Sequence, residues 1–562
     1  MSIFSKANIT ASDDFNRWLV PPISISIHLC IGSVYAWSMF NPALTKILGV
    51  ASSSAGDWTL SDVVWIFSTA IIFLGLAAAF AGKWLEEVGP RLVGFTAACL
   101  WGGGFLVGSI GIFFHELSLV YLGYGVLGGC GLGLGYVSPV STLIRWFPDR
   151  RGMATGMAIM GFGGGAMIGA PLISYLLDLF HVAPVYLGST SDLILKTIDG
   201  VRFADINGAL TEVVIVTASE AQNSDYSAGA YIVGTGDTGA GKTFVTLGVG
   251  YFIIMAIASF GYRIPVENWK PQGWDESKRK NNSSPVTSEN VHIDQALKTP
   301  QFYFLWIVLC FNVTAGIGVL GVAKTMMSDI FSNALPTIVN ASFAATYVLM
   351  ISAFNMVGRF FWASTSDYIG RKNTYYIFFI LGILLYTSIP FAASEMSINP
   401  SVVLLIYFYA ATMIIFTMYG GGFATIPAYL ADIFGTKYVG GIHGRLLTAW
   451  STAGVIGPLA ITTLRSNSIE SAIIDLSQKV DPQRFKDLFG DGIENISQLI
   501  LTKTVTIPKL MSIAPEGTAD PTSTLYNSTM FLMAFLLAIA LVANYLIKPV
   551  AVSYTHLRAH ET

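Results

Sequence analysis

A ten-residue stretch that occurs twice decides the fold. It reads Gly82-Lys-Trp-Leu-Glu86-Glu-Val-Gly89-Pro-Arg91 and, 281 positions later, Ala363-Ser-Thr-Ser-Asp367-Tyr-Ile-Gly370-Arg371-Lys372. Both copies have a small residue first, an acid fifth, Gly eighth and a basic residue tenth. The small residue lets a neighbouring helix approach, the Gly permits a tight turn with positive φ, and the acid can pair with basic groups or cap a helix N-terminus. The repeat indicates a chain with two equivalent halves.

Long apolar runs surround both copies. The chain has 562 residues, of which 53% are hydrophobic and only 12% are charged, about half of the charged fraction of a soluble domain. A helix that crosses a bilayer needs about 20 mostly apolar residues. Twelve such runs lie near residues 17–40, 63–81, 92–114, 119–144, 152–177, 244–262, 302–328, 343–365, 375–393, 402–431, 446–464 and 528–547. We therefore expect an all-α membrane protein with twelve transmembrane helices in two pseudo-symmetric six-helix bundles.

The loops between the spans define the expected domains. These are a cytoplasmic tail (1–16), an N-terminal bundle (17–262), a cytoplasmic linker (263–300), a C-terminal bundle (301–548) and a tail (549–562) whose ending SYTHLRAHET resembles translated vector sequence. Each bundle carries an external insertion, at about 178–243 and 465–527. Lys and Arg favour cytoplasmic loops, and they gather after spans 2, 4, 8 and 10. Both termini are therefore predicted to be cytoplasmic.

Composition argues against several classes of function. The net charge of −3 gives no indication of a nucleic-acid partner, and the four cysteines lie in apolar runs, which disfavours a disulfide framework. The sequence shows no cluster of metal-ligand residues, and we expect neither a metal nor a cofactor. We predict that the protein is not an enzyme.

One motif points to a nucleotide. The segment Gly236-Asp-Thr-Gly-Ala-Gly-Lys-Thr243 matches the P-loop pattern. A working P-loop needs a parallel sheet behind it and a solvated helix whose N-terminus holds the phosphates. Here the next residues enter the predicted span 244–262. We expect a Gly- and Thr-rich loop that leads into a helix, and no ATP binding.

Ionisable groups are rare inside the spans. The acids sit at the span ends, and only His28 and Arg359 lie well inside. Arg359 precedes Asp367 by eight residues, about 12 Å along a helix, which places it close to the middle of an apolar core of roughly 30 Å. A buried guanidinium is costly and offers a carboxylate two parallel donors. We predict that Arg359 binds an anionic substrate; the alternative is that it bonds backbone carbonyls or reaches the inner surface.

Further candidate residues follow from their chemistry. Aromatic groups with a polar tip suit the wall of an anion cavity, and the candidates are Tyr35, Tyr136, Tyr419 and Trp450. The alternative for each is an aromatic that packs or faces lipid. His28 is a candidate for proton coupling, because imidazole titrates near neutral pH. Its alternative is a packing histidine bonded to a neighbouring hydroxyl.

The loops also supply candidates for gating, whose contacts we expect to form in one conformation and break in another. They are Gly82, Glu86, Gly89, Arg91, Arg145, Asp367, Gly370 and Arg371. Arg145, at the inner edge of span 4, is expected to be an interfacial anchor or a gate residue rather than a substrate ligand.

The repeated loop resembles the signature loop of the major facilitator superfamily, with Glu86 in place of a more usual Asp. Longer motifs resemble the oxalate/formate antiporter family, among them Ser33-Val-Tyr35-Ala-Trp37, Tyr419-Gly-Gly-Gly-Phe and His443-Gly-Arg-Leu-Leu-Thr-Ala-Trp450. This resemblance implies that a basic residue of helix 8, here Arg359, binds substrate. It also implies a second basic residue in helix 11, which this sequence lacks around Trp450. One buried cation suits a monocarboxylate better than a compact dianion.

We therefore predict a secondary active transporter for a small organic anion, with a monocarboxylate favoured. Transport would proceed by alternating access, as exchange or with a proton, from a site near the midplane between the two halves. The protein would be a multi-pass component of a lipid bilayer, in the plasma or cell membrane. Two alternatives remain open: a transporter of the same fold for a neutral solute, and a non-transporting receptor or sensor whose external insertions bind a ligand.

Overall fold

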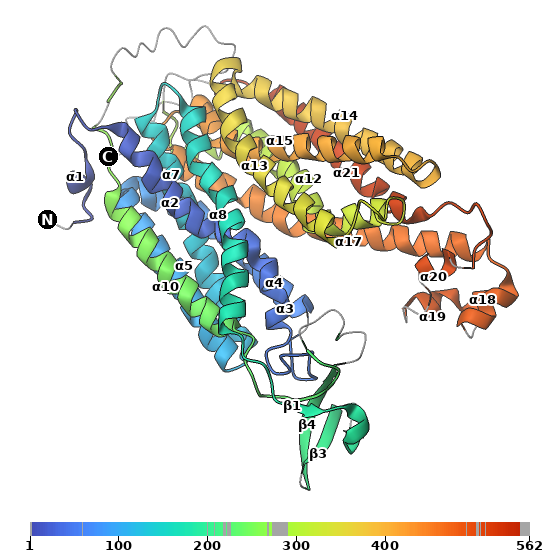
Figure 1. Cartoon of the computed structure of the whole chain (residues 1–562). Helices are drawn as coiled ribbons and strands as arrows, with labels where there is room; N and C mark the ends of the chain where they lie inside the picture. Colours follow the sequence, from blue (N-terminus) through green and yellow to red (C-terminus); the bar gives the residue numbers. More distant parts are fainter. Residues whose placement is uncertain are drawn as a thin grey trace. The chain divides into compact units, whose positions relative to one another are not determined.

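The computed structural model describes residues 3–550 except 59, 199–200, 207, 217–220, 222–225, 267–268, 272–289, 490–491, 502–504, 506 and 512. Within these residues, eleven helices are long and apolar enough to cross a membrane. The twelfth long helix, α13 (Ala341–Ile369), is outside that count. The predicted fold of membrane-spanning helices is confirmed, and Figure 1 shows how strongly long helices dominate the chain. Most of the predicted C-terminal tail and part of the predicted linker lie outside the described residues.

The chain forms two compact units. Unit 1 contains Met1–Asp149, Met157–Trp274 and Thr436–Ser451, and unit 2 contains Arg150–Gly156, Asp275–Gly435 and Thr452–Thr562. The division falls inside two long helices, α8 and α17. The first residues of α8 therefore belong to unit 2 and the rest of that helix to unit 1. The first residues of α17 belong to unit 1 and the rest to unit 2.

Unit 1 is built from helices that match the first six apolar runs. Pro90 is the first residue of α5, a position where its missing N–H leaves no donor unsatisfied. Helices α5 and α10 run side by side (Figure 1). The elements are α1 (Lys6–Ile9), η1 (Arg17–Leu19), α2 (Val20–Gly32), η2 (Ser33–Met39), α3 (Asn41–Leu44), α4 (Leu60–Val88), α5 (Pro90–Phe113), α6 (Leu117–Val120), η3 (Tyr121–Gly128), α7 (Gly129–Trp146), most of α8 (Arg151–Phe180), α10 (Ala240–Gly261) and α16 (Val439–Leu446).

The first insertion contains a five-stranded antiparallel sheet in the order β1-β5-β4-β3-β2. Its strands are β1 (Tyr186–Gly188), β2 (Leu195–Ile198), β3 (Val201–Ile206), β4 (Ala209–Val216) and β5 (Gly229–Ile232), with the short η4 (Thr190–Asp192) between the first two. Ala204, Val213 and Ala230 form a small apolar core on one face of this sheet. Alternating side chains explain that face, since successive residues of a strand point to opposite sides.

The P-loop-like segment closes on itself. The strand before it, β5, belongs to the antiparallel sheet, and the helix after it is α10. Asp237 holds the segment: its backbone pairs with Val182, its side chain accepts from the N–H of Gly239, and its carboxylate lies 2.9 Å from Nζ of Lys242. Two groups that would face phosphate in a P-loop, the N–H of Gly239 and the ammonium group of Lys242, thus both meet the carboxylate of Asp237.

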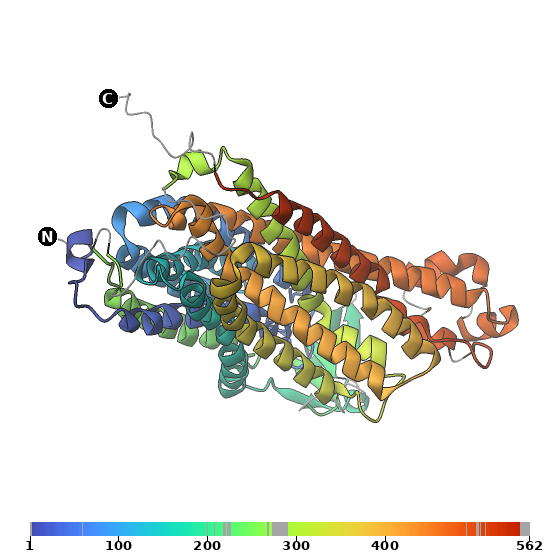
Figure 2. The ribbon, with the colours of Figure 1, turned by 90° about the horizontal axis from the view of Figure 1, so that it is seen from above.

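Unit 2 contains the longest helices, several with side-chain caps. The side chain of Asn340 accepts from the N–H of Phe343 to begin α13, and Ser401 accepts from Val403 to begin α15, as expected for residues favoured at helix N-caps. Helix α17 continues to Ser477, beyond the predicted end at 464. The elements are α11 (Ile293–Ala296), α12 (Pro300–Phe331), α13, α14 (Arg371–Ile398), α15 (Val402–Phe434), most of α17 (Thr448–Ser477), α18 (Pro482–Phe489), η6 (Ile493–Asn495), α19 (Ile496–Leu501), α20 (Ile507–Met511), η7 (Pro521–Thr524) and α21 (Asn527–Leu546). In Figure 2 the yellow-to-red helices of this unit lie alongside one another.

The turn geometry predicted for the repeated loops is confirmed. Gly89, between α4 and α5, and Gly370, between α13 and α14, both have φ of +87°. Side chains other than hydrogen are strained in this region of backbone space. The same sharp turn therefore joins the equivalent helix pairs of the two units.

Candidate functional site

Asp367, the acid of the second loop, caps a helix N-terminus as the sequence predicts. Its Oδ1 accepts from the N–H of Gly152 and its Oδ2 accepts from the N–H of Met153, both at 2.8 Å. These are among the first N–H groups of α8, which have no partner inside the helix. The carboxylate therefore satisfies two orphan donors and meets the positive end of the helix dipole.

A network of buried ions surrounds this cap within unit 2. Arg371 pairs with Asp367, donates to Oγ of Ser366 at 2.5 Å and lies 3.4 Å from Oδ2 of Asp432. Asp432 also forms an ion pair with Arg151, in which Nη1 of Arg151 lies 3.1 Å from Oδ1 of Asp432. Two carboxylates and two guanidiniums thus alternate, and the ends of α13 and α15 are tied to the start of α8. The sequence analysis did not predict that Asp432 and Arg151 belong to this network.

The first loop uses its acid differently. Glu86 pairs with Arg145 of α7 and lies beside Gly440, in the first turn of α16. Arg145 also donates to the backbone oxygen of Lys437, at 3.2 Å. Arg145 thus connects the loop acid to the segment that precedes α16, and its role in gating stays a prediction.

Two basic groups near the first loop bind backbone oxygens. Arg91 donates to the oxygens of Ile3 at 2.8 Å and Tyr262 at 3.3 Å, so it fastens the N-terminal segment and the end of α10. Lys6 donates to the backbone oxygen of Glu86. Burial lowers the pKa of Lys6, the positive charge of Arg145 lowers it further, and Glu86 acts in the opposite direction.

Gly82 lets α16 approach α4 closely, as the small residue at the start of the loop motif predicts. A Cβ atom built on Gly82 would lie 2.4 Å from Cα of Gly441, far inside any tolerated contact. We predict that Gly82→Val separates α4 from α16 and lowers stability by about 1–3 kcal/mol, with a lower melting temperature in detergent. Gly103→Val is the matched control, because a Cβ there meets nothing within 4 Å. Equal melting temperatures for both variants would contradict this account.

Arg359 lies in unit 2 and is 1% exposed. Its Nε donates to Oδ1 of Asn355 at 2.9 Å, and its Cζ lies 5.5 Å from the ring centroid of Phe423. Asn355 precedes it by one helical turn on α13, where side chains four residues apart meet. The guanidinium is therefore buried and oriented by a neutral amide and an aromatic face, rather than extended along the helix to a surface.

Asn355 was not singled out from the sequence, although a polar residue four positions before a buried Arg is a usable signal. We predict that Asn355→Asp raises the KM for a carboxylate substrate about tenfold or more, since an internal carboxylate would bind the guanidinium in its place. Asn355→Gln keeps an amide and serves as the control. Concentration-dependent uptake into proteoliposomes measures both, and an unchanged KM in Asn355→Asp would argue that Arg359 does not meet substrate.

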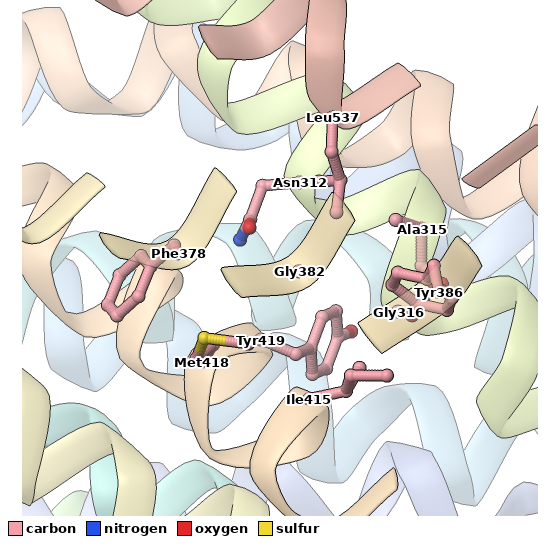
Figure 3. A pocket seen from close by; sticks show the side chains of 10 residues that line it. All are labelled: Asn312, Ala315, Gly316, Phe378, Gly382, Tyr386, Ile415, Met418, Tyr419 and Leu537. Carbon is pink, nitrogen blue, oxygen red and sulfur yellow. Dashed lines mark hydrogen bonds between the residues drawn. The ribbon is translucent and has the colours of Figure 1, made fainter. Parts of the chain in front are cut away.

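A small cavity lies beside Tyr419, another predicted site residue. Asn312, Gly316 and Tyr386 are among its walls, and Figure 3 shows Asn312 and Tyr419 from different helices around it. About 10 Å³ is open to the centres of water molecules, enough for about one water. Tyr419 also packs edge-on against Phe423, at 5.5 Å between centroids, so Phe423 contacts both Tyr419 and Arg359.

Tyr35, Tyr136 and Trp450, the three remaining aromatic candidates, come together in unit 1. The Trp450 ring lies 5.3 Å from Tyr136 and 6.3 Å from Tyr35, and Phe162 packs edge-on against all three. Tyr136 and Trp450 have no exposed surface, while Tyr35 is half-buried. We name these four residues the aromatic cluster. Phe162 was not foreseen, because its place depends on how α8 packs.

His28 borders the aromatic cluster. Its Nδ1 lies 2.6 Å from the carbonyl oxygen of Ala158 and its Nε2 lies 3.2 Å from that of Tyr136. Both of these contacts are to backbone carbonyl oxygens, and a role of His28 in proton coupling stays a prediction. A second histidine, His443 of α16, lies on the other side of Tyr136, at 5.8 Å between ring centroids; the sequence analysis used it only as part of a motif.

The predicted site residues thus fall into two groups that the structure builds separately. Arg359 and Tyr419 share Phe423 in unit 2, and Tyr35, Tyr136, Trp450 and His28 share the aromatic cluster in unit 1. Within the described residues, no group of three or more His, Cys, Asp or Glu side chains is arranged to hold a metal ion.

Comparison with known proteins gives relatives that cover most of the chain. This chain is 25% identical over 445 residues to the oxalate:formate antiporter of Oxalobacter formigenes. The alignment covers 79% of this chain and 83% of that protein. The chain is 22% identical over 488 residues to apicoplast pyruvate carrier 1 of Toxoplasma gondii, with 77% and 82% covered. The resemblance drawn from the loop and helix motifs is confirmed by these matches.

Solved structures agree on the fold. The Escherichia coli fucose:proton symporter superposes with a TM-score of 0.52 at 9% identity, covering 93% of this chain and 97% of that chain. A proton:xylose symporter gives the same TM-score at 12% identity, with 93% and 96% covered. A sequence profile of the Major Facilitator Superfamily matches residues 28–191 and 227–458, which is more than half of the chain. With the two loops, the long helices and this profile in agreement, the chain belongs to the Major Facilitator Superfamily of membrane transporters.

Proposed function

We propose that this transporter moves a small organic anion, specifically a monocarboxylate, by exchange or together with a proton. The observation that carries the proposal is Arg359, a guanidinium with 1% exposure in the interior of unit 2. A charge buried in an apolar interior is expensive, and in membrane proteins such residues mark substrate or ion pathways. Its positive sign selects an anion.

The surroundings of Arg359 suit recognition of a carboxylate. The bond from Nε to Asn355 fixes the plane of the guanidinium. The two terminal nitrogens of an arginine are the donors that bind a carboxylate end-on with two parallel hydrogen bonds. Phe423, 5.5 Å from Cζ, adds an apolar face. This combination of one oriented cation and aromatic walls fits a compact acid with a small apolar body.

The names of two relatives point in the same direction. One is an oxalate:formate antiporter and the other a pyruvate carrier, and all three named solutes are carboxylates. Between Arg445 and Arg465 this chain has no basic residue, so a second cation in that part of the helix is not available for a dianion. We therefore favour monocarboxylates such as formate and pyruvate over oxalate.

We further propose that both termini face the cytoplasm and that the protein acts in the plasma or cell membrane. The support for this orientation is the placement of Lys and Arg in the loops that follow spans 2, 4, 8 and 10. Under this orientation, the insertion with the β-sheet and the insertion with α18–α20 lie outside.

A substrate panel tests the proposal. Purified protein in proteoliposomes loaded with unlabelled pyruvate is expected to take up labelled pyruvate and formate faster than labelled oxalate, and to leave labelled glucose and glycine outside. Empty liposomes give the background. Uptake of glucose or glycine without uptake of any carboxylate would overturn the proposal.

A transporter for a neutral solute is the second candidate, and the bond between Arg359 and Asn355 is the observation that favours it. If this bond serves only to hold α13 in place, Arg359 is structural. The same panel separates the two, because a structural Arg359 predicts that solute preference survives its replacement by lysine.

A further inference from the structure

The two buried histidines of unit 1 differ sharply in their partners. Both ring nitrogens of His28 face backbone carbonyl oxygens, that of Ala158 at 2.6 Å and that of Tyr136 at 3.2 Å. A carbonyl oxygen only accepts, so each nitrogen must donate. Neutral imidazole has one N–H and one lone pair, whereas imidazolium has two N–H groups. The site around His28 is therefore shaped for the protonated form.

His443 has the opposite surroundings. It is 1% exposed, and neither of its ring nitrogens has a hydrogen-bond partner among the described residues. A buried imidazole without partners is much less costly as the neutral form than as a cation. The packing seen here thus keeps the proton off His443, although its ring nitrogens are able to bind one.

Tyr136 connects the two histidines. Its ring lies 5.2 Å from the His28 ring and 5.8 Å from the His443 ring, between centroids. Two positive imidazoles on either side of one tyrosine ring would repel each other. One proton, and not two, is therefore the natural load of the pair.

Other charged or titratable groups lie on the elements that pack around the two histidines. On the elements that pack against α16, Glu86 of α4 is paired with Arg145 of α7. On α10, which packs against α2, Tyr262 follows the last helical residue and is buried. Arg445 shares helix α16 with His443 and follows it by two residues, which places it on a different side of the helix.

We propose that His28 and His443, bridged by Tyr136, form a proton-carrying pair that takes one proton across the membrane with each carboxylate. This inference rests on the proposed transport function and adds its coupling group. On one side, an imidazole nitrogen accepts a proton from a hydronium ion and leaves water. On the other side, the imidazolium returns the proton to water. The proton cancels the single charge of a monocarboxylate, so the complete cycle moves no net charge.

The test separates coupling from transport. In proteoliposomes with an alkaline interior, a gradient of one pH unit is expected to drive accumulation of labelled pyruvate by wild type up to about tenfold, because one proton then accompanies each anion. His28→Gln and His443→Gln retain a polar side chain but cannot bind the proton. Both are expected to keep pyruvate exchange and to lose the pH-driven accumulation. His181→Gln, whose native ring bonds Tyr226 in the first insertion at 2.9 Å, should keep both activities.

A second measurement does not depend on folding of the variants. Adding pyruvate to weakly buffered wild-type proteoliposomes should make the outer medium more alkaline as protons enter with the anion. Wild type that exchanges pyruvate without this pH change would overturn the inference and leave the proposed function standing. Accumulation that persists in both glutamine variants would also overturn it, as would an equal loss of exchange and accumulation, which indicates a packing role. Wild type that moves no carboxylate would instead defeat the proposed function.

Discussion

Arg359→Lys is expected to raise the KM for pyruvate exchange by about 30-fold or more, because losing one of a pair of buried charge-assisted hydrogen bonds costs about 2–5 kcal/mol. Lysine keeps the positive charge, but its ammonium group presents a point charge in place of a planar fork. It also loses the Nε donor that bonds Asn355. Initial rates of labelled pyruvate uptake over a range of concentrations measure the effect.

The design of this experiment isolates recognition from folding. Arg484→Lys, in the short helix α18 of the second insertion, makes the same chemical change away from the proposed site and should leave KM unchanged. Melting temperatures of both variants in detergent show whether the fold survives. Equal KM values for wild type and Arg359→Lys, with both proteins folded, would mean that bidentate recognition at Arg359 is wrong.

Asp367→Asn is the other substitution with a large expected effect. It removes the charge that caps α8 and pairs with Arg371, whose side chain is 3% exposed. Breaking one partner of a buried pair costs about 3–5 kcal/mol, and losing a cap costs about 0.5–2 kcal/mol. We expect a clearly lower melting temperature and pyruvate exchange reduced about tenfold or more.

Glu86→Gln is the internal comparison, because Glu86 is the same acid of the other loop. Its partner Arg145 is 24% exposed, and more exposed ion pairs contribute less to stability. The decreases in melting temperature and in pyruvate exchange should therefore be smaller for Glu86→Gln than for Asp367→Asn. Asp192→Asn, in the short η4 of the first insertion, is the neutral control. A larger effect of Glu86→Gln would contradict the view that the second loop is the stronger of the two.

Helix content and the sharp turns were predictable because they depend on local sequence. A run of about 20 apolar residues has few alternatives to a helix in lipid, and every predicted span corresponds to helical segments. Gly89 and Gly370 share a positive φ, since the motif places glycine where other residues are strained. Arg359 was found by counting charges, because a cation in an apolar run is conspicuous without any structure.

Contacts between distant segments were not predictable. Trp450 belongs to the aromatic cluster only because residues 436–451 pack in unit 1, and nothing in the local sequence at the start of α17 indicates this packing. The partnership of Arg151 and Asp432 joins residues that are far apart in the chain. The first insertion could be identified as hydrophilic, but its five-stranded sheet depends on pairing among segments with weak individual signals.

The amino-acid sequence alone thus determined the class of protein, the helices and the presence of a guanidinium, that of Arg359, well inside an apolar span, because hydrophobic length, glycine geometry and charge are properties of short segments. Tertiary packing alone decided that Asp367 caps α8, and that His28 meets two carbonyl oxygens while the ring nitrogens of His443 have no hydrogen-bond partner among the described residues. The physical reason is that a hydrogen bond requires two atoms within about 3 Å, and only the packed helices bring residues so far apart in sequence to that distance.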